Sequence, residues 1–506
     1  MIPSRRHFLR TSAAVGSAFL GLKHLAGCST LTAPTDPLPD FVRDPHNLLH
    51  LPRGFTYQMF SRTGEKMDDG FLVPGAHDGM AAFPGPGGKT ILVRNHELTS
   101  FELRLGGAFG PKQQFLKNIP KEMMFDYGKG KQPGLGGTTT LVYDTKGQLL
   151  EKQFLSLAGT WRNCSGGPTP WGSWITCEES VQVAKDDWEQ DHGWCFEVPA
   201  SAQGLVKPVP LRAMGRFNHE AVAVDPTTGV IYLTEDRGDR REPLAEEYWY
   251  GMKPLALRPE DVGAGLLYRF LPHAPGELAR GGRLQALKIK DKPGCFTGNW
   301  EGRQIRVGES LDVEWIDLDQ VESPKDDLRH RGRAAGAAAF QRGEGIWYGK
   351  SAIYFCCTDG GPSKKGQVWK YTPSPDEGKP GETSRPGKLE LYIEPNDRSI
   401  LENCDNIMIA PWGDMILCED GPLGNFVIGV TPEGRLYRIA QVGMNRSELC
   451  GCCVSPDGTT LFLNIQRPGM TAAITGPLAK LSSPPPLPPP PPPPTAPPPS
   501  RPDARP

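Results

Sequence analysis

The chain has 506 residues, of which 60 are glycine and 52 are proline, while 38% are hydrophobic and only 8% are aromatic. This composition favours many turns and short strands over long amphipathic helices. Lysine plus arginine (56) nearly equals aspartate plus glutamate (58). No basic face is therefore expected, which argues against a nucleic-acid partner.

The N-terminal segment 1–28 is predicted to be an export signal. Arg5 and Arg6 precede a short apolar run over 11–22, as in the twin-arginine (Tat) signals that the Tat export machinery reads, and this run is too short to span a bilayer. The sequence Leu-Ala-Gly-Cys over 25–28 resembles a lipobox, in which Cys28 would carry a lipid anchor. We therefore expect the protein to lie in the periplasm or to be anchored to the outer membrane. We also expect it to be a monomer.

One pattern then recurs six times: a polar cluster, a short apolar strand, a turn, a second apolar strand and a second polar cluster. Its clearest copy begins at Asn218 and ends at Arg237. The other copies run over 77–97, 163–179, 342–360, 404–421 and 448–466. Each has the turn chemistry and the strand composition of a β-hairpin.

Recurring hairpins that cannot bury their own faces predict an all-β fold, a six-bladed β-propeller with loop insertions. The propeller is expected to form the catalytic domain over 35–480, with insertions at 240–259 and 272–328. A β-sandwich with decorations is the alternative. Residues 481–506 are almost all proline and are predicted to be a disordered, extended tail.

The polar clusters predict a metal site. Both outer ends of a hairpin lie at the same edge, so twelve polar loops should converge around one axis. The predicted ligands are Glu97, Cys177, Glu178, Glu179, His219, Glu220, Glu235, Asp236, Glu344, Asp405, Glu419, Asp420 and Glu448. Packed carboxylates repel one another and favour cations, and oxygen-rich loops favour Ca²⁺. A thiolate or an imidazole ligand indicates a transition metal beside Ca²⁺, and we expect this metal to be iron, as Fe³⁺. The alternative for any one acidic residue is a strand cap or a surface ion pair.

The thiolate is predicted to come from Cys177, because it alone among the cysteines immediately precedes two glutamates at the end of an inner strand. Its alternative role is that of a small buried hydrophobic residue. Some of the other cysteines are candidates for disulfides in an exported protein.

A pocket with several cations suits a small phosphorylated substrate, because metal ions orient phosphoryl oxygens and neutralise developing charge. Arg237 and Arg342 lie inside the polar clusters and are candidate catalytic residues, as is Asn95. Either arginine would bind phosphate oxygens in a bidentate manner or, alternatively, pair with a nearby carboxylate.

Three segments resemble the PhoX-type alkaline phosphatases, which depend on calcium and iron. They are Trp-Gly-Ser-Trp-Ile-Thr-Cys-Glu-Glu over 171–179, Phe-Asn-His-Glu-Ala over 217–221, and the stretch over 455–469. The resemblance extends over about 48–477. It implies a propeller that hydrolyses phosphomonoesters outside the cytoplasm, with an iron and calcium cluster held by the cysteine and several glutamates.

Two other function classes stay open. A calcium-binding six-bladed propeller acting as a lactonase or esterase would need one or two ions and no cysteine ligand. A binding module without catalysis would use calcium only to rigidify its loops. Metal content separates these from the phosphatase, because only the phosphatase is expected to contain iron beside calcium.

Overall fold

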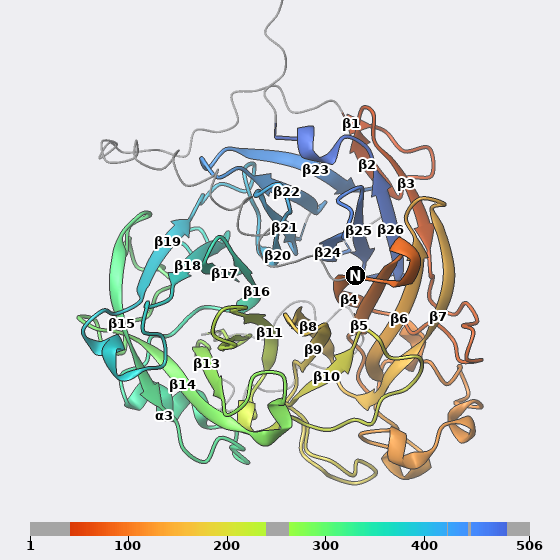
Figure 1. Cartoon of the computed structure of the whole chain (residues 1–506), viewed down its shortest axis with the longest axis horizontal. Helices are drawn as coiled ribbons and strands as arrows, with labels where there is room; N and C mark the ends of the chain where they lie inside the picture. The colour runs from red at the N-terminus through yellow and green to blue at the C-terminus, as the bar shows by residue number, and fades with distance from the viewer. Residues whose placement is uncertain (1–40, 239–262, 423, 444–446, 483–506) are drawn as a thin grey trace, which may run out of the picture.

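The computed structural model describes residues 41–238, 263–422, 424–443 and 447–482. The predicted Tat signal, the lipobox and most of the proline-rich tail lie outside these residues. The described chain is all-β in character, with sheets arranged around a central axis like the blades of a propeller (Figure 1). The α-helix α3 (Leu328–Ala334) is short, and no helix in this part of the chain is both long and apolar enough to cross a membrane. The predicted all-β, propeller-like fold is confirmed.

Three of the sheets have three or four strands. The first contains β4 (His77–Pro84), β5 (Thr90–His96), β6 (Gly136–Asp144) and β7 (Leu149–Thr160). The second contains β8 (Asn163–Pro168), β9 (Ser173–Glu178) and β10 (Cys195–Pro199). The third contains β24 (Leu449–Val454), β25 (Thr460–Ile465), β26 (Met470–Thr475) and the N-terminal β3 (Thr56–Phe60). Because β3 pairs with β26, the two ends of the described chain share one sheet and close the ring.

A six-stranded sheet also mixes early and late parts of the chain. It contains β20 (Cys404–Ile409), β21 (Met415–Glu419), β22 (Phe426–Val430), β23 (Leu436–Val442), β2 (Leu49–Pro52) and β1 (Phe41–Val42). Its pairing of β2 with β23 is a second link between the ends of the chain.

The fifth sheet has nine strands. One half contains β11 (His219–Val224), β12 (Ile231–Glu235), β13 (Leu267–Pro272), β14 (Gly282–Ile289) and β15 (Ser310–Asp317). The other half contains β16 (Gly343–Gly349), β17 (Ala352–Cys357), β18 (Gln367–Thr372) and β19 (Lys388–Ile393). The halves join through β15 and β19. The described strands thus form five sheets rather than six separate blades, because the predicted insertion at 272–328 supplies β14 and β15, which extend one hairpin sheet until it reaches the next.

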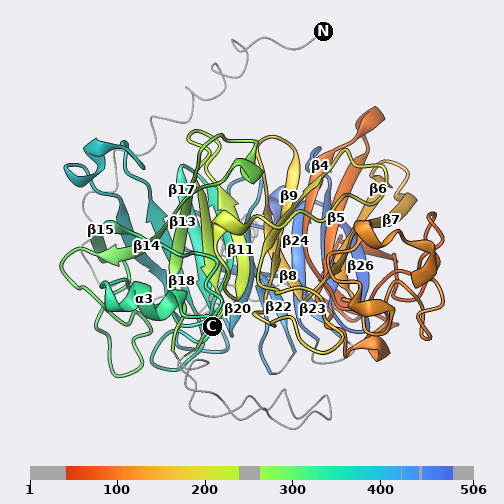
Figure 2. The same ribbon diagram turned by 90° about the horizontal axis from the view of Figure 1, so that it is seen from below.

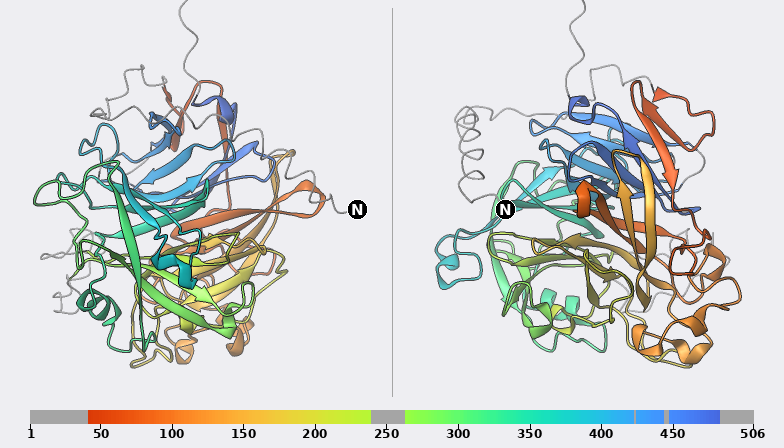
Figure 3. Two further views of the ribbon diagram at one scale, coloured as in Figure 1. Left: turned by 60° about the vertical axis from the view of Figure 1, so that its left-hand side comes forward. Right: turned by 45° about the vertical axis from the view of Figure 1, so that its right-hand side comes forward.

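Six strands surround the axis. Each of β4, β8, β11, β16, β20 and β24 contacts the next in this order, and β24 contacts β4 again. Figure 1 shows them at the centre of the ring, with the other strands of each sheet farther out. Figure 2 shows the same ring from the side, with the sheets standing roughly upright around it, and Figure 3 shows it from two oblique directions. Apolar residues fill the space between neighbouring sheets, as with Ile416 and Val427 on one sheet and Leu461 and Leu463 on the next.

Small residues let the central strands approach one another. A Cβ atom on Gly345 would lie 2.6 Å from the carbonyl oxygen of Asp405, and one on Gly451 would lie 2.4 Å from that of Asp78. A Cβ on Gly79 would lie 2.6 Å from the Cα of Ser165. Glycine is therefore required wherever one central backbone packs directly on the next.

We predict that Gly345→Ala lowers the free energy of unfolding by about 1–3 kcal/mol, because the added methyl group forces β16 and β20 apart. Urea denaturation followed by circular dichroism would measure this change. Gly204→Ala is the matched control, since nothing lies within 4 Å of a Cβ at that position. Equal stability of the two variants would show that the close approach of the strands is not needed.

Candidate metal centre

The second residue of every central strand is acidic or a cysteine. These residues are Asp78, Cys164, Glu220, Glu344, Asp405 and Cys450, and all six are buried. In each of the six strands the pairing with the next strand shifts register within the first few residues. A β-bulge of this kind re-aims the side chains beside it, and bulges are over-represented next to active sites. The repeated shift thus turns six similar residues toward the centre.

Four groups of potential ligands result. In each group one oxygen, nitrogen or sulfur atom per residue lies within 4.8 Å of the corresponding atoms of the others. The groups are Asp78, Glu97 and Cys164; Asp78, Glu448 and Cys450; Cys164, Glu179 and Glu220; and Glu220, Glu344 and Asp405. The first group shares Asp78 with the second and Cys164 with the third, and the third shares Glu220 with the fourth, so the four form one continuous cluster.

The second strand of each hairpin also contributes acidic residues. The alternation of side chains along a strand decides which of these residues faces the cluster. Glu178, Glu235 and Glu419 are each paired with the first residue of a central strand. The residues that come next along the chain are Glu179, Asp236 and Asp420. Successive side chains in a strand point to opposite faces, so only one member of each acidic pair faces the centre.

The residues that face the centre are hydrogen-bonded through their backbone to the start of a central strand. The backbone N–H groups of these residues donate to the carbonyl of the residue just before a central strand. The donors Glu97, Glu179, Asp236 and Asp420 bind the carbonyls of Ala76, Arg162, Asn218 and Asn403, respectively. Asp236 pairs with Arg342, and the negative charge of Asp420 contributes to raising the pKa of Glu448. Of these four, Glu97 and Glu179 belong to the ligand groups.

The outward glutamates brace loops within their own sheets. Glu178 accepts from Nδ1 of His192 at 2.7 Å and from the backbone N–H of Trp161 at 2.9 Å. Glu235 accepts from the Tyr268 hydroxyl at 2.7 Å, and Glu419 accepts from two backbone N–H groups. None of the three lies in a ligand group within the described ranges. Of the three predicted acidic pairs, the structure brings only Glu179 into a ligand group in the described part of the chain.

His219 and Cys177 also lie away from the four groups in the described part of the chain. Nε2 of His219 is 2.9 Å from the carbonyl of Gly215, and its Nδ1 is 3.4 Å from Sγ of Cys195, so both ring nitrogens have protein partners. Cys177 packs in a hydrophobic cluster, with its Sγ 3.7 Å from that of Cys195. The geometry therefore favours Cys164 over Cys177 as the candidate thiolate ligand. All eleven cysteines in the described ranges are free thiols, so the disulfides considered from the sequence are not formed there.

Sequence reasoning missed Asp78, Cys164 and Cys450 as individual ligands, although each lies inside a polar cluster that it recognised. The signal that would have found them is their shared place, the second residue of each central strand. It also missed Gln466, whose Nε2 lies 3.2, 2.9 and 2.7 Å from carboxylate oxygens of Asp78, Glu97 and Glu448. One amide NH₂ has two hydrogens and cannot satisfy three carboxylates.

Two arginines lie at the cluster. Arg342, one of the predicted catalytic residues, contacts Asp236 at 3.1 Å and Glu344 at 2.5 Å. Arg162, which the sequence did not single out, donates to Glu97 at 3.0 Å and to Glu179 at 2.8 Å, and its side chain is 41% exposed. The Arg162 side chain is thus partly exposed to solvent while its guanidinium binds two carboxylates of the cluster.

The other two predicted catalytic residues are engaged elsewhere. Arg237 contacts Asp326 at 3.3 Å. The Asn95 amide donates to the carbonyls of Cys164 and Ser165, and its oxygen accepts from Trp174 and Thr176. Asn95 is thus fully hydrogen-bonded and fixes the backbone that carries Cys164.

The electrostatics of the cluster favour cations. Burial, followed by the negative charges of Glu97 and Asp405, raises the pKa of Asp78 well above its usual range. Burial also raises the pKa of Glu179 to about 8 and that of Asp405 to about 6, although Arg162 and Arg342 respectively oppose these shifts. Oδ1 of Asp78 and Oε2 of Glu220 are buried without a hydrogen-bond partner. Buried oxygens of this kind, with carboxylates and a thiol around them, fit a set of bound cations.

The sequence matches one family model, described as alkaline phosphatase PhoX, over residues 37–153, 147–244 and 252–469. This chain belongs to the PhoX alkaline phosphatase family. The resemblance found in the sequence is thereby confirmed, and so is the enzyme class, a PhoX-like phosphatase. No curated protein matches the sequence.

Two solved structures illustrate what the fold resembles. Pseudomonas fluorescens PhoX in complex with vanadate, a transition-state analogue, is 16% identical with a TM-score of 0.60, and the match covers 88% of this chain and 98% of that one. The gluconolactonase XC5397 from Xanthomonas campestris is 12% identical with a TM-score of 0.39, covering 88% and 99%. At these identities the first comparison shows the shared fold of the PhoX family, and the second carries no further argument.

We predict that the protein loses stability as the pH rises when chelator has removed its metals. In the folded protein the pKa values of Glu179 and Asp405 are about 8 and about 6, against ordinary values of 4.5 and 3.8 for these side chains. Between these values the folded state holds protons that the unfolded state releases, so the free energy of unfolding falls by up to about 1.4 kcal/mol per pH unit per group. Thermal unfolding in EDTA at pH 5, 7 and 9 would measure the slope.

Added Ca²⁺ should flatten this slope, because a bound cation replaces the protons, and Glu179→Gln should reduce it. A stability that rises with pH in EDTA would contradict the assignment of a proton-holding carboxylate cluster.

Proposed function

We propose that this protein is an exported phosphatase that hydrolyses phosphate monoesters at the central cluster, with Ca²⁺ and Fe³⁺ as its cofactors. Membership of the PhoX family supports the phosphatase class. The observation that carries the metal assignment is the convergence of buried carboxylates on one thiol, with the oxygens of Asp78 and Glu220 left without a hydrogen-bond partner.

The donor atoms differ between the groups, and this suggests which ion each would hold. Glu220, Glu344 and Asp405 offer only oxygen, the ligand type that Ca²⁺ prefers. Cys164 belongs to two groups, and sulfur favours a transition metal such as iron. Cys450 is the weaker candidate, because its thiol donates to the carbonyl of His77 at 3.1 Å.

The side chains around the cluster would bind and orient the substrate. Arg162 and Arg342 present planar guanidinium groups that match phosphate oxygens, and both now pair with carboxylates that bound cations would partly neutralise. Glu97 and Glu179 hold Arg162 in place, and Asp236 holds Arg342. When bound, the metal ions would supply charge neutralisation and a bound water of lowered pKa.

The nine-stranded sheet is best understood as two blades joined at their outer edges, which would make a six-bladed propeller. The order of contacts among β4, β8, β11, β16, β20 and β24 supports this count. The second residue of each of these strands would then come from a separate blade, as the repeats in the sequence predict.

We predict that Cys164→Ser lowers bound iron and the hydrolysis of an aryl phosphate together, each by at least about tenfold, because the variant loses the thiolate ligand. Metal analysis by mass spectrometry and steady-state kinetics would measure both. Cys177→Ser is the matched control and tests the assignment made from the sequence: as a packing residue, it should lower stability while each folded molecule keeps its iron and its turnover. The reverse result, with iron lost only from Cys177→Ser, would restore Cys177 as the ligand.

The export route remains a proposal that rests on the sequence over 1–28. We predict that replacing both Arg5 and Arg6 with lysine leaves precursor in the cytoplasm, because the Tat machinery reads the arginine pair. Cell fractionation and immunoblotting would measure this. In the same assay, Cys28→Ala should move the protein from the membrane to the soluble periplasmic fraction. Normal export of the lysine variant would exclude the Tat route.

A further inference from the structure

Two long loops form a wall beside the central cluster. The first, over 97–135, connects β5 to β6, and the second, over 179–194, connects β9 to β10. Lys121 binds Glu189 at 2.8 Å and Lys131 binds Asp187 at 3.3 Å, so ion pairs link the loops. Buried hydrogen bonds add to this link, because Asp126 of the first loop accepts from the backbone N–H of Glu189. The two loops therefore behave as one structural unit.

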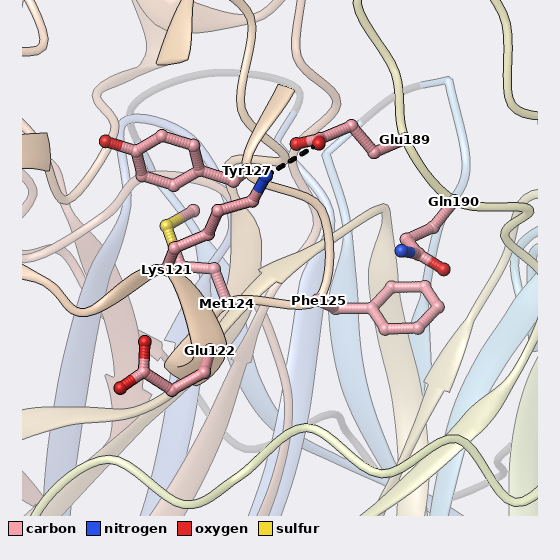
Figure 4. Close-up of a pocket in the computed structure, with 7 residues that line it drawn as sticks. All are labelled: Lys121, Glu122, Met124, Phe125, Tyr127, Glu189 and Gln190. Atoms are coloured by element: carbon pink, nitrogen blue, oxygen red, sulfur yellow. Dashed lines mark hydrogen bonds and ion pairs between the residues drawn. The ribbon is translucent and has the colours of Figure 1, made fainter. Parts of the chain in front are cut away.

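A shallow pocket of about 420 Å³ lies at the junction of the loops. Figure 4 shows Lys121 reaching across it to Glu189, with Phe125 and Tyr127 on the same wall. Among its polar lining residues, Lys121 and Glu189 form an ion pair across the junction of the two loops. This pocket is therefore the seam between the two loops and not a second binding site.

An aromatic cluster on the same wall has a different character. The rings of Phe101, Trp161 and Trp188 contact one another, with centroid separations of 5.0–6.0 Å. Phe101 is 55% exposed, one of the few large hydrophobic residues exposed in the described part of the chain. Trp161 is 3% exposed, and the indole N–H groups of Trp161 and Trp188 are both buried without a hydrogen-bond partner.

The aromatic cluster adjoins the rim of the central site. Trp161 immediately precedes Arg162, whose guanidinium binds Glu97 and Glu179. Phe101 follows Glu97 by four residues, on the loop that leaves β5. The contact of Phe101 with Trp161 thus joins the exposed ring to the chain segment that carries Arg162.

We propose that Phe101, Trp161 and Trp188 form a subsite for the alcohol portion of the ester and favour substrates in which this alcohol carries a planar ring. An exposed ring that already packs on two indoles offers a rigid face for offset stacking. The inference rests on the proposed phosphatase function, because Arg162 must hold the phosphate for the ring to reach this subsite.

The test compares ring-bearing and ring-free esters on the metal-loaded enzyme. Phe101→Ala should lower kcat/KM for p-nitrophenyl phosphate and for adenosine monophosphate by about three- to tenfold, mainly through KM, and leave kcat/KM for glycerol 3-phosphate unchanged. The two ring-bearing esters distinguish a simple aryl group from a nucleobase. An equal loss on all three esters would overturn the subsite.

Leu149→Ala is the matched control, because Leu149 is 58% exposed and begins β7, whereas Trp161 follows the last residue of that strand. The 12 residues of β7 separate the two positions by about 40 Å. This control should change none of the three rates. A loss matching that of Phe101→Ala would show a general effect of removing surface apolar area.

A binding measurement separates failure of the subsite from failure of the proposed function. Phenylphosphonate should quench tryptophan fluorescence at lower concentration than methylphosphonate, and this difference should disappear in Phe101→Ala. If none of the esters is hydrolysed but the difference persists, the subsite stands and the proposed reaction fails. Equal binding of the two phosphonates by the unmodified protein would overturn the subsite, whatever the enzyme hydrolyses.

Discussion

Repulsion between buried carboxylates is the constraint on which the centre of this protein depends. Six strands converge on one axis, and four of them place a carboxylate there while two place a cysteine. Moving a charged carboxylate out of water costs several kcal/mol unless an opposite charge lies beside it. Arg162, Arg342 and Gln466 compensate only part of this cost, and oxygens of Asp78 and Glu220 still have no hydrogen-bond partner. The fold therefore calls for cations at the point where its strands meet.

The rest of the architecture brings these groups close enough to share ions. Glycines at 79, 345 and 451 let neighbouring backbones touch, and the register shift near the start of each central strand turns the second residue inward. Pairing of the N-terminal β3 with β26 closes the ring, so the two ends of the described chain cannot separate without breaking the hydrogen bonds between these strands. Stability and site geometry thus depend on the same contacts, and a change at Gly345 should affect both.

The polar residues that do not face the axis make the rim rigid. Glu178 fixes His192 and the backbone at Trp161, immediately before Arg162, while Asn95 fixes the backbone at Cys164. The loops over 97–135 and 179–194 are linked by ion pairs and carry the aromatic cluster to the side of Arg162. The groups that we propose to hold the phosphate and those that we propose to contact its ester are therefore supported by one scaffold, which would give a physical basis for substrate preference in an otherwise highly charged site.

The sequence by itself determined the all-β class, the six repeated hairpins and the acidic character of the loops where they meet, because turn residues and alternating strand patterns are local properties. Its resemblance to the PhoX family was also correct. The tertiary structure alone decided which acidic residue of each pair faces the axis, since a single step along a strand reverses the side chain. Glu178 and Glu179 are neighbours in sequence, yet one braces a loop and the other lies in a ligand group. In the same way, Cys177 and Cys164 both lie near strand ends, and only the bulge in β8 and the close approach of neighbouring strands put Cys164 among the carboxylates.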